Sequence, residues 1–200
     1  MILRLAAIGV TAALLATMLA AISMPASAAE SLKEAIADSE FGYSFRWRIE
    51  HIDQHPLPHN ALAIPLRARI HLHTAAFYGL SAKAEVDYVF NFGMSNFNAG
   101  AGNTPNPPGY PTIADPQGGD LNQLFLQYKA QFGGQFRLGR QRIIYDNARF
   151  IGNVGWRQNE QTFDAISYDH KTSNGWHLQY AYLDQARRVL VPRYQPVNLT

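Results

Sequence analysis

A strict alternation of apolar and polar residues is the feature that most constrains how this chain folds. The segment 43–50 reads YSFRWRIE, in which every odd-numbered residue is apolar and every even-numbered residue is polar. Successive side chains of a strand point to opposite faces, so this period of two predicts a strand with one apolar and one polar face. The same period predicts seven strands in all: 43–50, 62–73, 80–92, 122–130, 135–144, 160–169 and 176–183.

The connections between these strands alternate in length: they are short at 77–80, 131–135 and 171–175, and long at 93–120 and 145–159. The first long connection is dense in Gly, Asn and Pro and is expected to be a loop. Tight turns on one rim and long loops on the other are typical of an all-β, antiparallel up-and-down transmembrane β-barrel. The alternation loses its phase around 139–142, where we expect a β-bulge.

The N-terminus has the pattern of a secretory signal peptide. Arg4 precedes an almost wholly apolar run that ends near Ile22, and Ala26-Ser27-Ala28 supplies the small residues that a signal peptidase reads. We therefore expect three regions: a signal peptide at 1–28, a periplasmic N-terminal tether with a short helical turn at 29–42, and a β-domain at 43–200.

Alternation alone does not distinguish a membrane barrel from a soluble sheet, because both have one apolar face. Two further observations favour the barrel. Arginine and lysine point to the same face from several successive strands, and aromatic residues gather at strand ends and on apolar faces, as an interfacial girdle requires. The alternative is a secreted soluble β-sandwich that binds carbohydrate through exposed aromatic residues.

The most distinctive stretch of sequence lies at 138–166. It contains GRQR at 139–142, Asn147, RFIG at 149–152 and GWRQNEQTFD at 155–164. These residues resemble the alginate export family of Gram-negative outer-membrane porins. The resemblance implies an outer-membrane channel for passive diffusion or export of anionic or polar solutes, among them polyuronates such as alginate. It also implies outer-membrane lipid, a small solute or polysaccharide, and the barrel assembly machinery as partners.

Members of that family are much longer than this chain and have more strands. Single-chain bacterial barrels have an even number of strands, whereas seven are predicted here. We therefore expect 43–200 to be the N-terminal part of a porin domain, which makes it an incomplete barrel.

The candidate functional residues are the cations of the polar face, which would line the lumen. A set of guanidinium groups attracts carboxylate or phosphate and repels cations. The alternative is that these cations pair with Glu50, Glu85, Asp87 and Asp164 and only make the wall rigid. The predicted lumen-lining residues are Arg46, Arg48, Arg67, Arg69, Lys83, Lys129, Arg137, Arg140 and Arg142.

The segment 156–159 (WRQN) allows two interpretations. It could fold back into the pore as a constriction, or it could be a structural corner at which Gly152 and Gly155 turn the chain. The second is favoured here, because aromatic residues flanked by glycine often anchor a turn.

Other functions lack their residues. The net charge of +2 does not suit a dedicated nucleic-acid binder, and the absence of cysteine leaves no disulfide framework. His71 and His73 share a strand face, but no third ligand accompanies them, so no metal site is expected. There is no Gly-x-Ser-x-Gly elbow or other hydrolase constellation, so we expect neither catalytic residues nor a cofactor.

Overall fold

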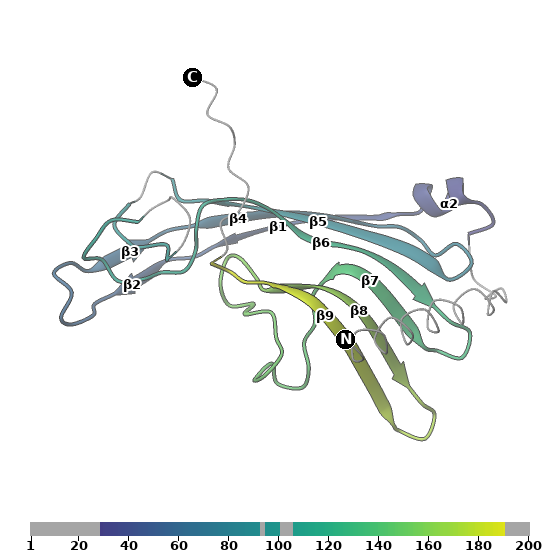
Figure 1. The fold of residues 1–200 in the computed structure, drawn as a ribbon. Coiled ribbons are helices and arrows are strands. Elements are labelled where there is room, and N and C mark those ends of the chain that lie inside the picture. Colours follow the sequence, from purple (N-terminus) through teal and green to yellow (C-terminus); the bar gives the residue numbers. More distant parts are fainter. Residues whose placement is uncertain (1–28, 93–94, 101–105, 191–200) are drawn as a thin grey trace, which may run out of the picture.

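The computed structural model describes residues 29–92, 95–100 and 106–190, so the expected signal peptide lies outside the described part of the chain. The fold is all-β and antiparallel, as predicted (Figure 1). Seven strands form one sheet in the order β1-β4-β5-β6-β7-β8-β9, and β1 and β9 are the edges of the sheet as described. The strands are β1 Glu40–Trp47, β4 Leu66–His73, β5 Leu80–Phe90, β6 Gly118–Lys129, β7 Gln135–Gln141, β8 Thr162–Lys171 and β9 His177–Arg187.

The predicted second strand, 62–73, is interrupted. Pro65 lies within it and has no N–H to donate to the sheet, so the run divides into β3 (Ala61–Ala63) and β4. β3 pairs with β2 (Glu50–Ile52) in a separate two-stranded sheet. β1 begins at Glu40, which is inside the segment expected to be a tether.

The bulge expected at 139–142 was misplaced. β7 keeps a regular register with both neighbouring strands up to Arg140 and Gln141. The register shifts lie elsewhere, between Glu85 and Val86 opposite β6 and between Asp164 and Ala165 opposite β9.

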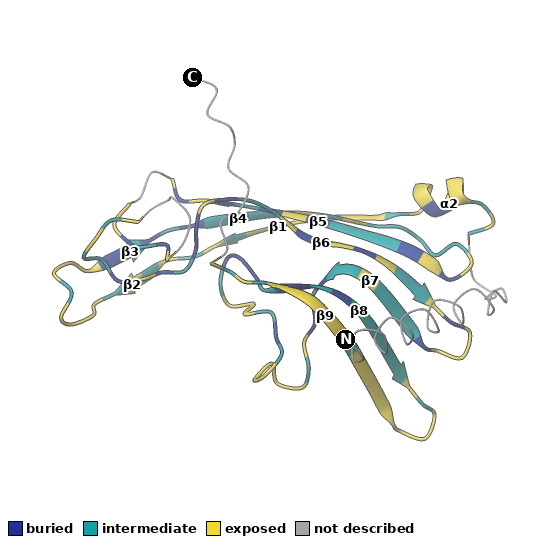
Figure 2. Ribbon diagram, viewed as in Figure 1, coloured by how far each residue is buried: buried dark blue, intermediate teal, exposed yellow. Residues whose placement is uncertain are grey.

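In a soluble protein the apolar face of a sheet is buried and the polar face is exposed, and this sheet shows the reverse. Apolar side chains are exposed, with Phe45 at 68% and Trp47 at 69%, whereas Glu85 and Asp87 on the other face are only 3% and 4% exposed. Figure 2 shows long exposed stretches in β1 and β9 and buried positions on β5 and β6. A sandwich would instead cover the apolar face with a second sheet.

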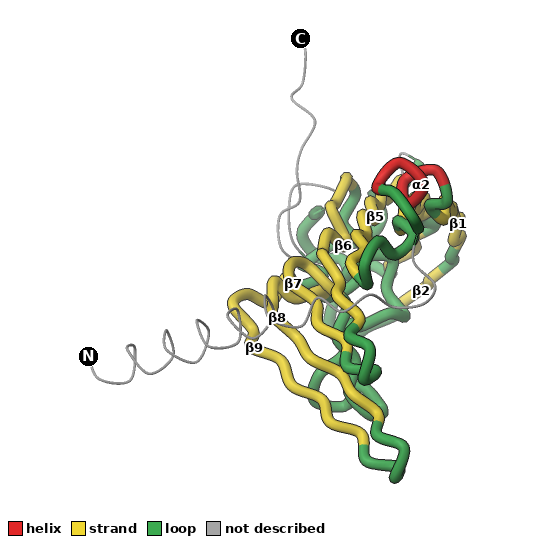
Figure 3. Tube along the Cα trace, turned by 90° about the vertical axis from the view of Figure 1, so that its right-hand side faces the viewer, coloured by secondary structure: helices red, strands yellow, loops and turns green. Residues whose placement is uncertain are grey.

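The sheet is strongly bent. In Figure 1, β1 and β4 run almost level while β8 and β9 descend steeply, and the view in Figure 3 shows the strands stepping around from β1 to β9. We call the buried polar side the inner face and the exposed apolar side the outer face. A set of strands must curve to enclose a lumen.

The connections at the two ends of the sheet differ in length, as predicted. Short turns join the strands at 74–79, 130–134 and 172–176, whereas the opposite end carries the connections 48–65, 91–117 and 142–161. Helix α2 (Leu32–Ala37), which Ser31 caps by accepting a bond from the N–H of Glu34, lies at the short-turn end, where the carbonyl of Ala35 accepts from the N–H of Ala75 (3.1 Å). Among the described residues, no helix is long and apolar enough to cross a membrane.

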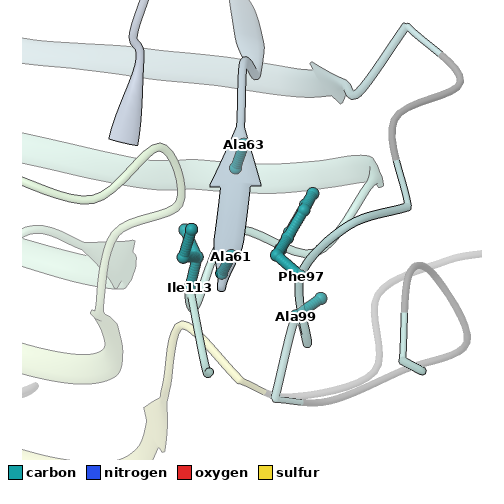
Figure 4. Packing of buried hydrophobic residues seen from close by; sticks show 5 residues of the cluster. All are labelled: Ala61, Ala63, Phe97, Ala99 and Ile113. Atoms are coloured by element: carbon teal, nitrogen blue, oxygen red, sulfur yellow. The ribbon is translucent and has the colours of Figure 1, made fainter. Parts of the chain in front are cut away.

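Two of the long connections fold together into a small cap. Ala61 and Ala63 of β3 pack with Phe97, Ala99 and Ile113, all fully buried (Figure 4). The N–H of Leu62 donates to the carbonyl of Asn96 at 2.9 Å, which fixes one connection to the other. The glycine-rich segment therefore acquires a core by sharing one with β2 and β3.

The close approach of β6 and β7 at Gly139 predicts that a side chain at this position would destabilise the fold. Gly139 has φ +123°, and a Cβ there would clash with the carbonyl oxygen of Leu124. We expect Gly139→Ala to lower the stability of the folded protein by about 1–3 kcal/mol. Thermal unfolding in detergent measures this. Gly119→Ala in β6 is the matched control, because its Cβ would meet only an ordinary contact with Tyr88; equal destabilisation by both would contradict the argument.

Candidate functional site

The connection between β7 and β8, residues 142–161, lies across the inner face; we call it the inner segment. The Arg46 guanidinium of β1 donates to the carbonyls of Gly155 (2.8 Å), Arg157 (3.1 Å) and Trp156. Arg48 donates to the same Trp156 carbonyl at 2.7 Å. Three strands separate β1 from β7 in the sheet, so these bonds require the sheet to curve around the segment.

A buried glutamine fixes the middle of the inner segment to the wall. The side-chain amide of Gln158 donates to the carbonyls of Pro65 (2.7 Å) and Arg46 (3.0 Å), and its backbone N–H donates to Asp115 Oδ1 (2.8 Å). Asp115 comes from the long connection before β6, so the inner segment also joins the cap to the sheet. Of the two interpretations of 156–159, the structure has the segment folded back across the inner face.

The start of the inner segment is anchored by apolar contacts. Ile143 packs with Phe163 and Ala165 of β8, and Tyr145 and Ile151 lie against this cluster. Phe163 and Ala165 are inward-facing positions of β8, so this is a small dry patch on an otherwise polar face.

The end of the inner segment enters a cluster of ion pairs, which we call the central ion cluster: Arg69, Arg142, Glu85, Asp87 and Glu160. Arg69 binds Asp87 with two bonds, Nε to Oδ1 at 2.7 Å and Nη2 to Oδ2 at 2.6 Å, and also pairs with Glu160. Arg142 binds Glu160 at 2.5 Å and Glu85 at 3.0 Å. Each carboxylate is therefore shared or held in a fork, which is the geometry that makes a buried ion pair tolerable.

Amide groups complete this cluster. Asn122, the residue that the bulge in β6 leaves without a partner in β5, donates to Glu85 (2.7 Å) and Glu160 (3.1 Å). Gln123 donates to Glu85 at 3.1 Å, and Asn153 donates to Glu160 at 2.7 Å. The bulge thus turns two successive side chains of β6 to the inner face.

The environment of Glu160 favours its charged form. Burial by itself raises the pKa of Glu160, but hydrogen bonds from Arg142 and the positive charges of Arg69 and Arg142 outweigh it and lower the pKa to about 2. Asp115, by contrast, has its pKa raised by burial, which the N–H of Gln158 and the charges of Arg48 and Arg157 only partly offset. The arginines lie at 3.7 and 3.8 Å from Asp115 Oδ2, too far for hydrogen bonds.

The inner face is open toward the short-turn end. A cavity of about 210 Å³ is lined there by Gln135, Arg137, Ser167 and Asp169. Arg137 donates to Gln127 (2.9 Å) and lies over the ring of Phe125, with 5.2 Å between the guanidinium carbon and the ring centroid. Within the described part of the chain, Arg137 forms no ion pair, and Asp169 is the carboxylate that lines the same cavity.

The predicted lumen cations occupy different surroundings. Most lie on the inner face, and five of them contact the inner segment. Lys83 lies 3.7 Å from Glu85, and Lys129 is exposed with no ion pair to another described residue. Arg140 shares the outer face with Leu138. The five in contact with the inner segment, in which Arg142 itself lies, are Arg46, Arg48, Arg67, Arg69 and Arg142.

Sequence reasoning did not select several residues of this site. These residues lie in connections or at a bulge, where the alternation does not predict which face a side chain points to: Glu160, Asp115, Asn122 and Asn153. The available signal was composition: the WRQNEQ stretch carries polar side chains with few glycines, which is unusual for an exposed loop.

The central ion cluster predicts that Glu160 holds the inner segment in place. Glu160→Gln removes the carboxylate that Arg69 and Arg142 share, and breaking such buried ion pairs costs about 3 kcal/mol. We expect the segment to open more than a hundredfold more often. Hydrogen exchange of residues 142–161 measures this, and Arg149→Gln, at an exposed position of the same segment, is the control. Unchanged exchange in the Glu160 variant would show that the cluster does not retain the segment.

The lowered pKa of Glu160 also predicts how attachment depends on pH. Because the pKa lies below the ordinary 4.5, the pairing stabilises the segment fully above pH 4.5 and is lost as the pH falls toward about 2. We expect the fluorescence of Trp156, measured with Trp47 and Trp176 replaced by Phe, to change across this interval. The same titration of Glu160→Gln should show a smaller change; an equal change would exclude Glu160 as the titrating group.

Comparison with known proteins agrees with this architecture. No curated protein and no solved structure matches the chain. The family model described as alginate export matches residues 38–184, which include all of β1 and extend into β9. A match over about three quarters of the sequence shows that the chain belongs to the alginate export family.

Proposed function

We propose that this protein forms the wall of a channel in the outer membrane of a Gram-negative bacterium, through which anionic or polar solutes diffuse or are exported. Membership of the alginate export family supports a polyuronate such as alginate as one of these solutes. The curved all-β sheet supports a barrel wall, and its edges at β1 and β9 need further strand pairing in lipid, where exposed backbone groups find no partner.

The observation that carries this proposal is the inversion of the two faces. Leucines and aromatic residues cover the outer face, while charged residues are buried on the inner face. In water, an exposed apolar face of this extent would associate or aggregate. In a bilayer the same face is satisfied, and the charged face meets a water-filled lumen. Lipid is therefore the partner proposed for the outer face.

The proposed preference for anions depends on which cations of the inner face lack a carboxylate partner. In the central ion cluster three carboxylates surround two arginines, so neither arginine lacks a partner and this region mainly holds the inner segment across the lumen as a constriction. Toward the short-turn end, Arg137 and Lys129 are not matched in this way, and Arg137 borders a polar cavity. A solute carboxylate passing there meets an open guanidinium fork.

We further propose that transport involves no catalysis. The inner face of the described sheet presents ion pairs and amides, which suit the passage of a polar solute. Secretion through the expected signal peptide and insertion by the barrel assembly machinery complete the proposal. The alternative, a soluble carbohydrate-binding sandwich, requires a dry core between two sheets, but Phe45 and Val86 are exposed and the charged face is buried.

The proposal predicts anion selectivity that depends on the unpaired cations. We expect the protein, extracted in native form from outer membranes and reconstituted in planar bilayers, to give reversal potentials that favour anions. One charge facing the permeating ion across a few ångströms of water is worth about 0.5–1 kcal/mol, so Arg137→Gln should lower the anion-to-cation permeability ratio about two- to fivefold.

Two further measurements complete this test. Lys129→Gln should reduce selectivity in the same direction, whereas Arg140→Gln, which removes a charge from the outer face, should leave the ratio unchanged. Cation preference in the wild-type protein would reject the anion channel. Recovery of the protein only from the aqueous periplasmic fraction would reject the membrane channel altogether.

A further inference from the structure

Three charged residues lie together on the outer face, beside side chains that otherwise suit lipid. Arg140 follows Leu138 on the same face of β7, and its register partner in β8 is Asp164, which precedes Ile166 on that face. Leu138 is 55% exposed, which fixes this as the outer side. Arg187, the last residue of β9, completes what we call the outer cluster.

The outer cluster holds two arginines around the carboxylate of Asp164, and the charge of Asp120 in β6 also acts on Arg140. Arg140 binds Asp164 through Nε (2.8 Å) and Nη2 (3.3 Å), and its Nη1 donates to the carbonyl of Leu121 (3.0 Å). Arg187 binds the same carboxylate through Nε alone, at 3.0 Å. Two guanidinium groups thus share one carboxylate, and the Nη groups of Arg187 have no hydrogen-bond partner among the described residues.

The position of the outer cluster along the strands determines which part of a lipid it could contact. All three residues lie at the long-loop ends of their strands: Arg140 and Asp164 stand on either side of the connection 142–161, and Arg187 ends β9 opposite Thr162. An uncompensated arginine in hydrocarbon is costly, by about 2–4 kcal/mol at the bilayer centre and much less at the interface. The end of the strands places the cluster at headgroup depth, where a phosphate can accept hydrogen bonds from the Nη groups of Arg187.

We propose that the outer cluster binds the phosphate of a lipid headgroup in the outer leaflet, with Arg187 as the principal contact. Its side chain is 37% exposed, whereas that of Arg140 is 19% exposed and makes three hydrogen bonds to Asp164 and Leu121. A planar guanidinium with free Nη groups matches a phosphate with two parallel hydrogen bonds. The site rests on the proposed membrane location and lies on the opposite side of the sheet from the conducted solute.

Lipid binding to the natively extracted protein tests the site. In neutral detergent, the protein is titrated with diphosphoryl lipid A, with zwitterionic phosphatidylethanolamine and with inorganic phosphate, and bound lipid is counted by native mass spectrometry. We expect retention of lipid A and about tenfold weaker binding in Arg187→Gln, as for the loss of a charge-assisted hydrogen bond. Arg187→Lys should restore part of the affinity, and Arg149→Gln, an exposed arginine of the inner segment, is the matched control.

The outcomes separate this site from the proposed function. Equal binding of lipid A by wild type and Arg187→Gln, or an equal loss in Arg149→Gln, overturns the site. Displacement of lipid A by inorganic phosphate at matched concentration shows an ion site rather than a lipid site, which also overturns it. Reversal potentials measured on the same preparations report the channel independently, and we expect Arg187→Gln to leave them unchanged.

Discussion

The structure depends on the pairing of guanidinium and carboxylate groups on the inner face of a curved sheet. Arg69 and Arg142 are held by Glu85, Asp87 and Glu160, and these bonds link β4, β5 and the end of the inner segment. A water-soluble sheet would turn these charges outward and pack its leucines. Here the apolar side is left to lipid, so polar contacts must provide the cohesion that a hydrophobic core gives elsewhere. The only sizeable apolar packing described lies in the cap and beside Ile143, at places where connections meet.

The inner face has two regions, which differ in whether their arginines are paired with carboxylates. Near the long-loop end, opposite charges are matched and the inner segment is fixed by bonds to carbonyls of residues far away in sequence. Near the short-turn end, Arg137 is stacked on Phe125 and kept extended by Gln127 without a carboxylate partner. Matched charges lose their attraction for a passing ion, whereas an oriented but unpaired guanidinium keeps it. The same residue type therefore supports structure in one region and, in the proposed channel, selectivity in the other.

The strands were predictable from sequence because a period of two leaves little freedom: one step of slip would move every leucine to the lumen. The same rule correctly predicted that the side chains of Arg46, Arg67 and Arg69 share the polar face of the sheet. The inner segment was not predictable, because the bonds that place it join Arg46 to residues more than one hundred positions later, and no local pattern encodes them. The interruption at Pro65 could have been predicted, because proline has no N–H to donate to a neighbouring strand. It was missed because the apolar alternation continues on both sides of Pro65.

Arg140 shows how the same rule also corrects a functional assignment. A bulge at 139–142 would have turned its side chain toward the lumen with the other arginines. Without a bulge, Arg140 keeps the parity of Phe136 and Leu138 and must face outward. The glycine before it explains both facts: Gly139 adopts φ +123°, which lets β7 pass close to Leu124 while keeping its register. An arginine on the outer face then needs a carboxylate from the next strand, and Asp164 supplies it, so in the proposed channel the charge at this position faces the membrane rather than the pore.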